Sequence, residues 1–203
     1  MAEYSYANTP KVNKQVKDTL VNKIIPASFA APINKALAHY PELKNTKITW
    51  RIKHAYTPLT TRPSFASLFK AKSKRSYIIT ISDKTIDTLE HLLYKHLTYD
   101  EQVGIMGHEL GHVVDFSNKN MLQSARSAIG HLSSKYIDRM EYHTDMICIQ
   151  HGLGKQLEEY STYVRTKMHV HDWRGVDNVY HNDQTHERYM NPETIEKLMH
   201  SGH

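Results

Sequence analysis

The chain has 203 residues, the length of one ordinary domain and enough to bury a sizeable core. The absence of any apolar run of about 18 residues excludes a membrane-spanning helix, and the single cysteine, Cys148, excludes an intramolecular disulfide and a zinc site built from several cysteines. The formal net charge is +5, and part of it lies in the run KAKSKR at 70–75, which could contact phosphates but is more typical of a solvated loop.

The pattern of apolar residues predicts an α+β fold, mostly helical with a small sheet, as a single domain over 1–203. The alternation of Ile48, Trp50 and Ile52 predicts a strand near 46–56, and the β-branched run SYIITIS predicts a second strand at 76–82. Residues 57–74 hold two prolines and many small polar residues, so a long loop is expected there. Helices are predicted at 11–22, 28–40, 85–97, 120–132, 134–150, 154–169 and 191–200.

A further helix, which begins near residue 98, carries the clearest signals. The sequence TYDE at 98–101 has the pattern of a capping box, and apolar residues between 103 and 114 form one face of the helix that follows. Gly104, Gly107 and Gly111 are poor helix formers. We therefore expect something to approach this helix closely, either a packed second helix or a metal with its substrate.

The sequence HELGH at 108–112 lies on this helix. His108 and His112 are four residues apart, so their side chains project side by side, and Glu109 lies next to the first of them. Two neutral imidazoles can bind zinc, and the glutamate can accept a proton from the metal-bound water. A hydrolytic zinc site takes three protein ligands, so a third ligand should come from elsewhere in the chain.

The sequence EYHTD at 141–145 is the better source of that ligand. Glu141 and Asp145 share one face of a predicted helix, so one carboxylate can bind zinc while the other accepts the free N–H of a ligand histidine. In combining HExxH with a downstream ExxxD, the chain resembles the gluzincin metallopeptidases, as a compact soluble member. The resemblance covers about 76–116 and 138–146, within a motif core at 76–150.

This resemblance implies a zincin-like domain and a zinc-dependent peptidase that acts on peptides or proteins. It makes His108, His112 and Glu141 the zinc ligands, Glu109 the general base and Asp145 the residue that orients a ligand histidine. It also implies that the strand at 76–82 binds an extended substrate by edge pairing. The residue that stabilises the developing oxyanion should follow the third ligand, and His186 and Tyr189 are the candidates.

Two alternatives remain open at this point. SprT-type proteases, which act on DNA-bound proteins, pair HExxH with a third histidine; His131 could serve, and the basic run 70–75 would suit nucleic acid. A non-catalytic zinc-binding scaffold is the other alternative, although it would not need Glu109. A metzincin is excluded, because Asn118 and Asp115 stand where that class requires histidine and glycine. The start of the chain lacks the apolar segment of a secretory signal, so a cytoplasmic location is expected.

Overall fold

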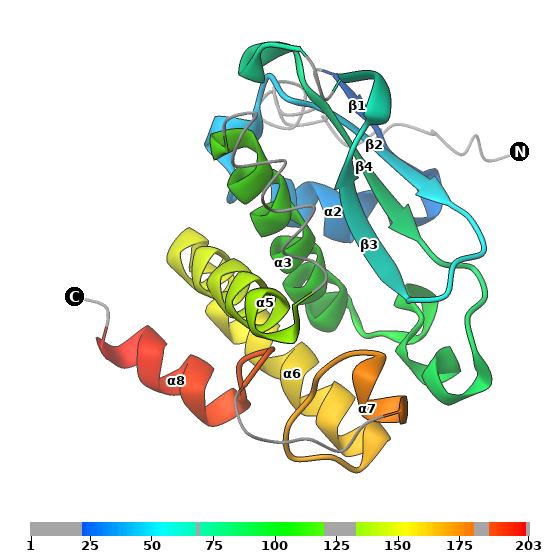
Figure 1. Ribbon diagram of the computed structural model, residues 1–203, viewed down its shortest axis with the longest axis vertical. Coiled ribbons are helices and arrows are strands. Elements are labelled where there is room, and N and C mark those ends of the chain that lie inside the picture. Colours follow the sequence, from blue (N-terminus) through cyan, green and yellow to red (C-terminus); the bar gives the residue numbers. More distant parts are fainter. Residues whose placement is uncertain (1–21, 68–69, 120–132, 181–186, 202–203) are drawn as a thin grey trace, which may run out of the picture.

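The computed structural model describes residues 22–67, 70–119, 133–180 and 187–201. A four-stranded sheet lies on one side of the long helix α3 (Tyr99–Asn118), and the other long helices pack on its opposite side (Figure 1). The predicted α+β fold is therefore confirmed. Within the described residues, no helix is both long and apolar enough to cross a membrane.

The sheet has the strand order β1-β2-β4-β3. Strands β1 (Lys23–Ile24), β2 (Lys47–Ile52) and β4 (Ser76–Ile81) are parallel, and β3 (Leu59–Pro63) runs antiparallel to β4 at the outer edge. Strands β2 and β4 confirm the strands predicted near 46–56 and 76–82.

The expectation that residues 76–82 form a free edge for substrate is wrong. Strand β4 pairs with β2 on one side and with β3 on the other, so both of its edges are occupied. The edge beside α3 belongs instead to β3, which lies inside the segment 57–74 that was predicted to be a loop.

The helices follow the predicted order. The segment 85–97 differs, because it forms two short 3₁₀ turns, Asp87–Leu92 and Tyr94–His96, in place of one α-helix. The predicted helices at 134–150 and 154–169 are separated by a kink in the turn Ile149–Leu153, where Gly152 takes a left-handed backbone conformation with a φ of 75°. The predicted helices at 11–22 and 120–132 lie outside the described residues. The remaining α-helices are α2 (Ala30–Leu37), α5 (Ser134–Cys148), α6 (Gly154–Met168), α7 (Asp177–Tyr180) and α8 (Pro192–Ser201).

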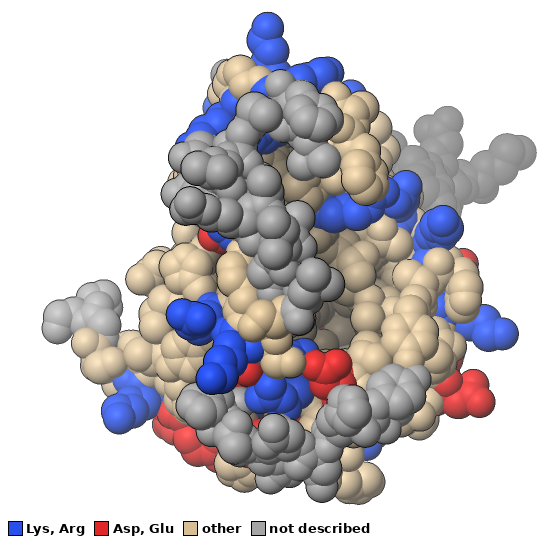
Figure 2. Space-filling view, in the orientation of Figure 1, with Lys and Arg blue, Asp and Glu red and all other residues tan. Residues whose placement is uncertain are grey.

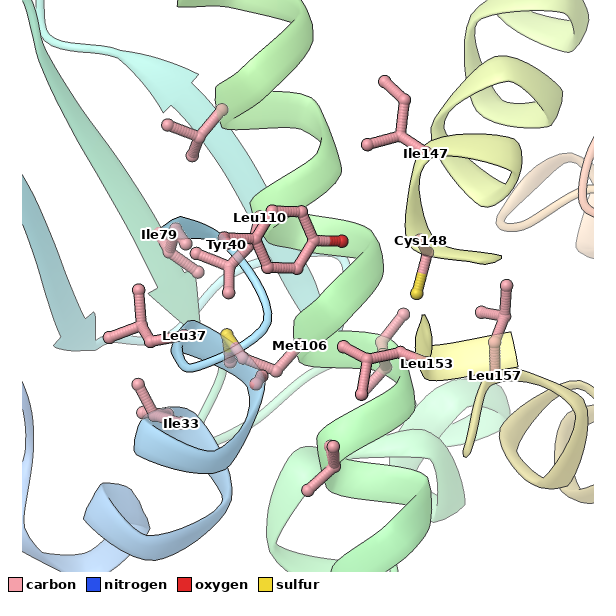
Figure 3. Close-up of a cluster of buried hydrophobic side chains, with 14 of the residues drawn as sticks. Ile33, Leu37, Tyr40, Ile79, Met106, Leu110, Ile147, Cys148, Leu153 and Leu157 are labelled. Carbon is pink, nitrogen blue, oxygen red and sulfur yellow. The ribbon is translucent and has the colours of Figure 1, made fainter. Parts of the chain in front are cut away.

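The main hydrophobic core surrounds α3. Met106 and Leu110 face α2 and the sheet, while Cys148 and Leu153 approach the same helix from the other side (Figure 3). The buried Tyr40 hydroxyl of this core donates to the Gly107 carbonyl at 2.7 Å. Because α3 is enclosed on several sides, its position is set by the packing of the whole domain.

The three glycines of α3 lie where α5, α6 and the turn between them come closest. A Cβ atom on Gly104 would overlap the backbone of Gln156 in α6, and one on Gly107 would lie 2.6 Å from Leu153 and 2.8 Å from Cys148. A Cβ on Gly111 would lie 3.0 Å from the Thr144 methyl group in α5. The expectation of a closely packed second helix is therefore confirmed, and this close approach brings EYHTD next to HELGH.

Both ends of α3 are capped. At its start, the Thr98 hydroxyl accepts from the amide of Glu101, and the Glu101 carboxylate accepts from the amide of Thr98, which confirms the predicted capping box. At its end, Lys72 donates to the carbonyl of Asn118 at 2.5 Å, and Arg75 donates to the carbonyl of Lys119 at 2.8 Å. Two cations of the basic run thus complement the negative end of the helix dipole.

Candidate metal centre

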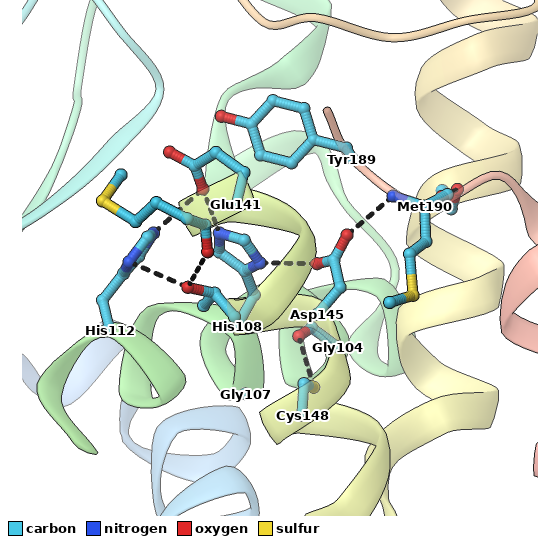
Figure 4. A network of polar contacts seen from close by, with 12 residues as sticks. Gly104, Gly107, His108, His112, Glu141, Asp145, Cys148, Tyr189 and Met190 are labelled. Atoms are coloured by element: carbon cyan, nitrogen blue, oxygen red, sulfur yellow. Dashed lines mark hydrogen bonds and ion pairs between the residues drawn. The ribbon is translucent and has the colours of Figure 1, made fainter. Parts of the chain in front are cut away.

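His108, His112 and Glu141 converge in the interior between α3 and α5. One turn of α3 separates the two histidines, and the Glu141 Oε2 atom lies 3.1 Å from the Nε2 atom of each of them. All three side chains are buried, and their ligand atoms lie within 4.8 Å of one another (Figure 4). These residues form a cluster that could hold a metal ion.

The other ring nitrogen of each histidine is held in place by α5. The Nδ1 atom of His108 lies 2.7 Å from Asp145 Oδ1, and the Nδ1 atom of His112 lies 3.2 Å from the Thr144 hydroxyl. That hydroxyl donates its proton to the carbonyl of Met140, so it must accept from His112. Both rings therefore carry a proton on Nδ1, which leaves Nε2, the nitrogen that faces Glu141, as the atom that would bind a metal.

Two of the three distances between the ligand atoms fit zinc. Atoms that lie about 2.0–2.1 Å from a tetrahedral zinc ion are roughly 3.3 Å apart, close to the 3.1 Å between Glu141 and either histidine. Two histidines and one carboxylate also form a ligand set known from zinc hydrolases. The chemistry of the donors and the distances from Glu141 to the two histidines therefore suit this metal.

The electrostatics of the cluster keep its carboxylate ionised. Burial alone would raise the pKa of Glu141, but the charges and hydrogen bonds of His112 and His108 lower it far below its usual range. Burial alone would lower the pKa of His108, yet Asp145 and Glu141 raise it well above its ordinary value. A bound metal ion would take the place of the protons between the histidines and Glu141, and it would balance the negative charge of the Glu141 carboxylate.

Glu109 lies beside the cluster, at 5% exposure, on the side of the edge strand. The hydroxyl of Thr61 in β3 lies 2.6 Å from the Glu109 Oε2 atom and 3.3 Å from the Glu109 carbonyl. A hydroxyl that donates to one carboxylate oxygen fixes the plane of the carboxylate and leaves the other oxygen for a water molecule. No motif in the sequence points to Thr61, because the segment that forms β3 is predicted to be a loop.

Tyr189 is the only one of the two predicted oxyanion-stabilising residues that the structure describes, since His186 lies outside the described residues. The Tyr189 ring centroid is 5.7 Å from that of His108, and the ring lies beside Glu141 (Figure 4). Burial, reinforced by Glu141, raises the pKa of Tyr189 well above its ordinary value, so the phenol keeps its proton.

Tyr160 of α6 lines the same cavity, and burial together with Glu109 likewise raises its pKa. Sequence reasoning missed Tyr160, which no motif marks.

Two anchors hold the segment that carries Tyr189. The backbone N–H of Met190 donates to Asp145 Oδ2 at 2.8 Å, so the carboxylate that orients His108 also fixes the chain next to Tyr189. The Arg188 guanidinium contacts Asp138 of α5 at 2.8 Å and Asp177 at 2.6 Å. The charge of Arg188 is thus balanced by two carboxylates, and its role here is to secure the segment.

A cavity of about 270 Å³ opens onto the three candidate ligands. The edge strand and Glu109 form one part of its wall, and α6 with Tyr189 forms another. The space-filling view shows a recess near the middle of this face of the molecule (Figure 2). A substrate could therefore reach both the candidate ligands and Glu109.

The predicted ligands His108, His112 and Glu141 thus lie together, with Asp145 and Glu109 next to them. The alternative third ligand, His131, lies outside the described residues. No family model matches the chain, and no curated protein or solved structure is significantly similar to it.

Proposed function

We propose that the protein is a zinc-dependent peptidase. The observation that carries this proposal is the buried cluster of His108, His112 and Glu141 with a second carboxylate, Glu109, at the same cavity. A metal-binding scaffold needs the cluster but has no use for Glu109. A glutamate that is fixed by Thr61 and faces open space supports a catalytic reading.

Zinc, when bound, supplies a Lewis acid that acidifies a water molecule and polarises a carbonyl group. Glu109 accepts the proton of the attacking water through the carboxylate oxygen that Thr61 does not hold. The same carboxyl group then passes this proton to the amine nitrogen that leaves the peptide. Proton transfer by one residue in both directions requires a side chain that stays in place, and the Thr61 hydrogen bond supports this.

The tyrosines supply hydrogen-bond donors at the same cavity. A negative charge develops on the carbonyl oxygen of the peptide during attack, and a preorganised O–H group stabilises it. Tyr189 is our first candidate for that donor, because its ring lies next to His108 and its phenol keeps its proton. Tyr160 is the second candidate.

Strand β3 offers a place for an extended substrate. The N–H of Ser64 donates to the Ser76 carbonyl and so points toward β4. By the alternation of antiparallel strands, the backbone groups of Thr61 point away from β4, to the side where no described strand pairs with β3. A peptide that adds to this edge would lie beside the cavity and Glu109. Thr61 would then contact the substrate through its backbone and the general base through its side chain.

The proposal is tested by Glu109→Gln, which preserves the shape of the side chain but removes the proton acceptor. We expect zinc to remain bound near one ion per chain and peptide hydrolysis to fall by at least about 100-fold. Metal content is measured by mass spectrometry and hydrolysis by digestion of a peptide library. Undiminished cleavage by this variant would rule out the proposed mechanism.

A further inference from the structure

The cavity extends well beyond the candidate metal centre. Away from His108 and His112, it continues between the 3₁₀ turn Asp87–Leu92, helix α6 and the segment around Trp173. Its volume of about 270 Å³ is many times the roughly 30 Å³ that one water molecule occupies in the liquid. Protein interiors leave few voids larger than a water molecule, so a space of this size next to a reactive site is suited to a ligand.

The far end of the cavity is apolar. Leu89, Leu92, Val164 and Trp173 form a second hydrophobic cluster, separate from the main core, and each of them is at most 7% exposed. All four also line the cavity, so this cluster forms its wall. An apolar group of a ligand would bury its surface against these side chains.

Charged ligand groups are not favoured there. Apart from residues of the candidate metal centre, Arg165 is the one charged residue among the described residues that line the cavity. Its guanidinium already donates to the Ser161 hydroxyl, the Asn191 amide oxygen and the backbone carbonyls of Ser161, His171 and Tyr189. Arg165 therefore braces the wall and has little capacity left for an acidic group.

We propose that the apolar end of this cavity binds a large apolar side chain of the substrate, from a residue that flanks the scissile bond. This inference rests on the proposed peptidase function, since the cavity is continuous with Glu109 and with the edge strand that would hold the peptide. If each heavy atom occupies about the volume of a water, the four-atom side chain of leucine or methionine takes roughly 120 Å³ and a peptide group about as much. Together they fit within the whole cavity of about 270 Å³, whereas the larger rings of phenylalanine and tryptophan leave too little room for the reacting group.

Direct binding tests the cavity independently of catalysis. Trp173 lines the cavity, whereas the other tryptophan, Trp50, lies in the main core, so ligand-dependent changes in emission report on Trp173. The full-length protein is titrated with N-acetyl-leucinamide and, as a control, N-acetyl-glycinamide. We expect N-acetyl-leucinamide to bind at least about 10-fold more tightly than N-acetyl-glycinamide. The change in tryptophan emission that it causes should vanish in Trp173→Phe. Equal affinity for the two compounds would overturn the inference.

Substitutions in the wall should change the preference in opposite directions. Val164→Phe fills the cavity, so we expect leucinamide binding to weaken at least about 10-fold and cleavage to shift toward glycine and alanine next to the scissile bond. Leu92→Ala enlarges the cavity and should shift the preference toward phenylalanine and tryptophan, which keeps the test decisive if Val164→Phe does not fold. Ile52→Phe adds the same ring at an exposed position of β2 and should change neither preference.

A peptide-library digest separates this inference from the proposed function. Cleavage without preference for an apolar flanking residue would overturn the inference and leave the peptidase function intact. If no peptide is cleaved but leucinamide still binds selectively and Val164→Phe abolishes that binding, the peptidase function fails and the apolar ligand site stands.

Discussion

At the scale of single residues, Asp145 has two tasks in the site. One carboxylate oxygen accepts from the Nδ1 of His108, and the other accepts from the backbone N–H of Met190. The first contact turns the Nε2 atom of His108 toward Glu141, and the second fixes the chain that carries Tyr189. Loss of Asp145 should therefore weaken metal binding without removing a ligand, whereas loss of Glu141 removes a ligand itself.

This difference gives a ranked prediction for metal affinity. In Glu141→Ala, zinc should be lost or bound far more weakly, and in Asp145→Ala its affinity should fall by roughly 10–100-fold. His131→Ala, which removes the alternative third ligand, should have little effect. Zinc titration against a competing chelator measures all three. Zinc that is retained in Glu141→Ala but lost in His131→Ala would contradict both the ligand set and the gluzincin interpretation.

Thr61 offers a second prediction at this scale, for catalysis. Thr61→Val keeps the shape of the side chain but removes the hydroxyl that holds Glu109, so kcat should fall by roughly 10-fold or more while KM changes little. Thr61→Ser restores the hydroxyl and should restore kcat. Zinc content should be the same in both variants. A fall in kcat that is equal for valine and serine would mean that Thr61 acts only through packing.

Most of these residue roles could be predicted from sequence, because the spacing of HELGH and EYHTD on helices dictates which side chains face one way. Thr144 lies inside the second motif, but nothing in the sequence identifies the hydroxyl that accepts from His112. Thr61 and Tyr160 come from elements far away in the chain. Their contribution depends on tertiary packing, which a local pattern does not encode.

At the scale of elements, the close packing of α5 and α6 against α3 decides whether the site forms. The glycines of α3 let the neighbouring backbones approach, and this approach brings Glu141 within 3.1 Å of both histidines. A wider spacing between α3 and α5 would separate the third ligand from the first two. The low helix propensity of these glycines is thus offset by helix packing.

Substitution of these glycines should destabilise the protein in a ranked order. Alanine at an open helix position would stabilise by about 1 kcal/mol relative to glycine, but in Gly104→Ala the new Cβ meets the backbone of Gln156, which cannot move aside. We expect a net loss of about 1–3 kcal/mol or more. Gly111→Ala meets a methyl group at 3.0 Å and should cost less. Urea unfolding measures both, and a stabilised Gly104→Ala would contradict the packing.

The edge strand is the element that sequence reasoning did not find. Strand β3 is short, its sequence LTTRP is rich in threonine, and prolines lie at or next to both of its ends. An edge strand needs only one partner, so proline and polar residues are tolerated there, and the strand has no clear apolar alternation. The run YIITI at 77–81 did hold a usable signal, because consecutive apolar residues are typical of a parallel strand with both faces covered.

At the scale of the whole molecule, the candidate centre joins parts of the chain that are far apart in sequence. The edge strand, α3, α5 and the segment before α8 all supply contacts to it. A metal ion that binds the folded state but not the unfolded chain therefore stabilises the entire domain. The charged residues of the cluster are buried and have lost their hydration. Without a metal ion, only their contacts with one another compensate for that loss.

Zinc should accordingly raise the melting temperature. A free zinc concentration about 1,000 times Kd stabilises a folded protein by about 4 kcal/mol, which corresponds to a rise of roughly 8–16 °C for a chain of this size. A chelator should reverse this rise, and Glu141→Ala should show none. Magnesium should have little effect, because imidazole ligands suit zinc far better. Calorimetry measures the melting temperature with zinc, with zinc and chelator, with magnesium, and for Glu141→Ala with zinc. Equal melting temperatures with zinc and with magnesium would contradict the site.

The hydrogen bond between Asp145 and the backbone N–H of Met190 joins two parts of the chain that leave the ribosome at different times. His108, His112 and Glu141 leave the ribosome well before residue 190, so a nascent chain can gather its three candidate ligands while the segment with Tyr189 is still missing. Such a chain lacks one anchor of Asp145 and a candidate oxyanion donor. Under the peptidase function proposed above, hydrolysis would then begin only after the candidate ligands have been brought together, and the growing polypeptide would be protected from cleavage by its own site.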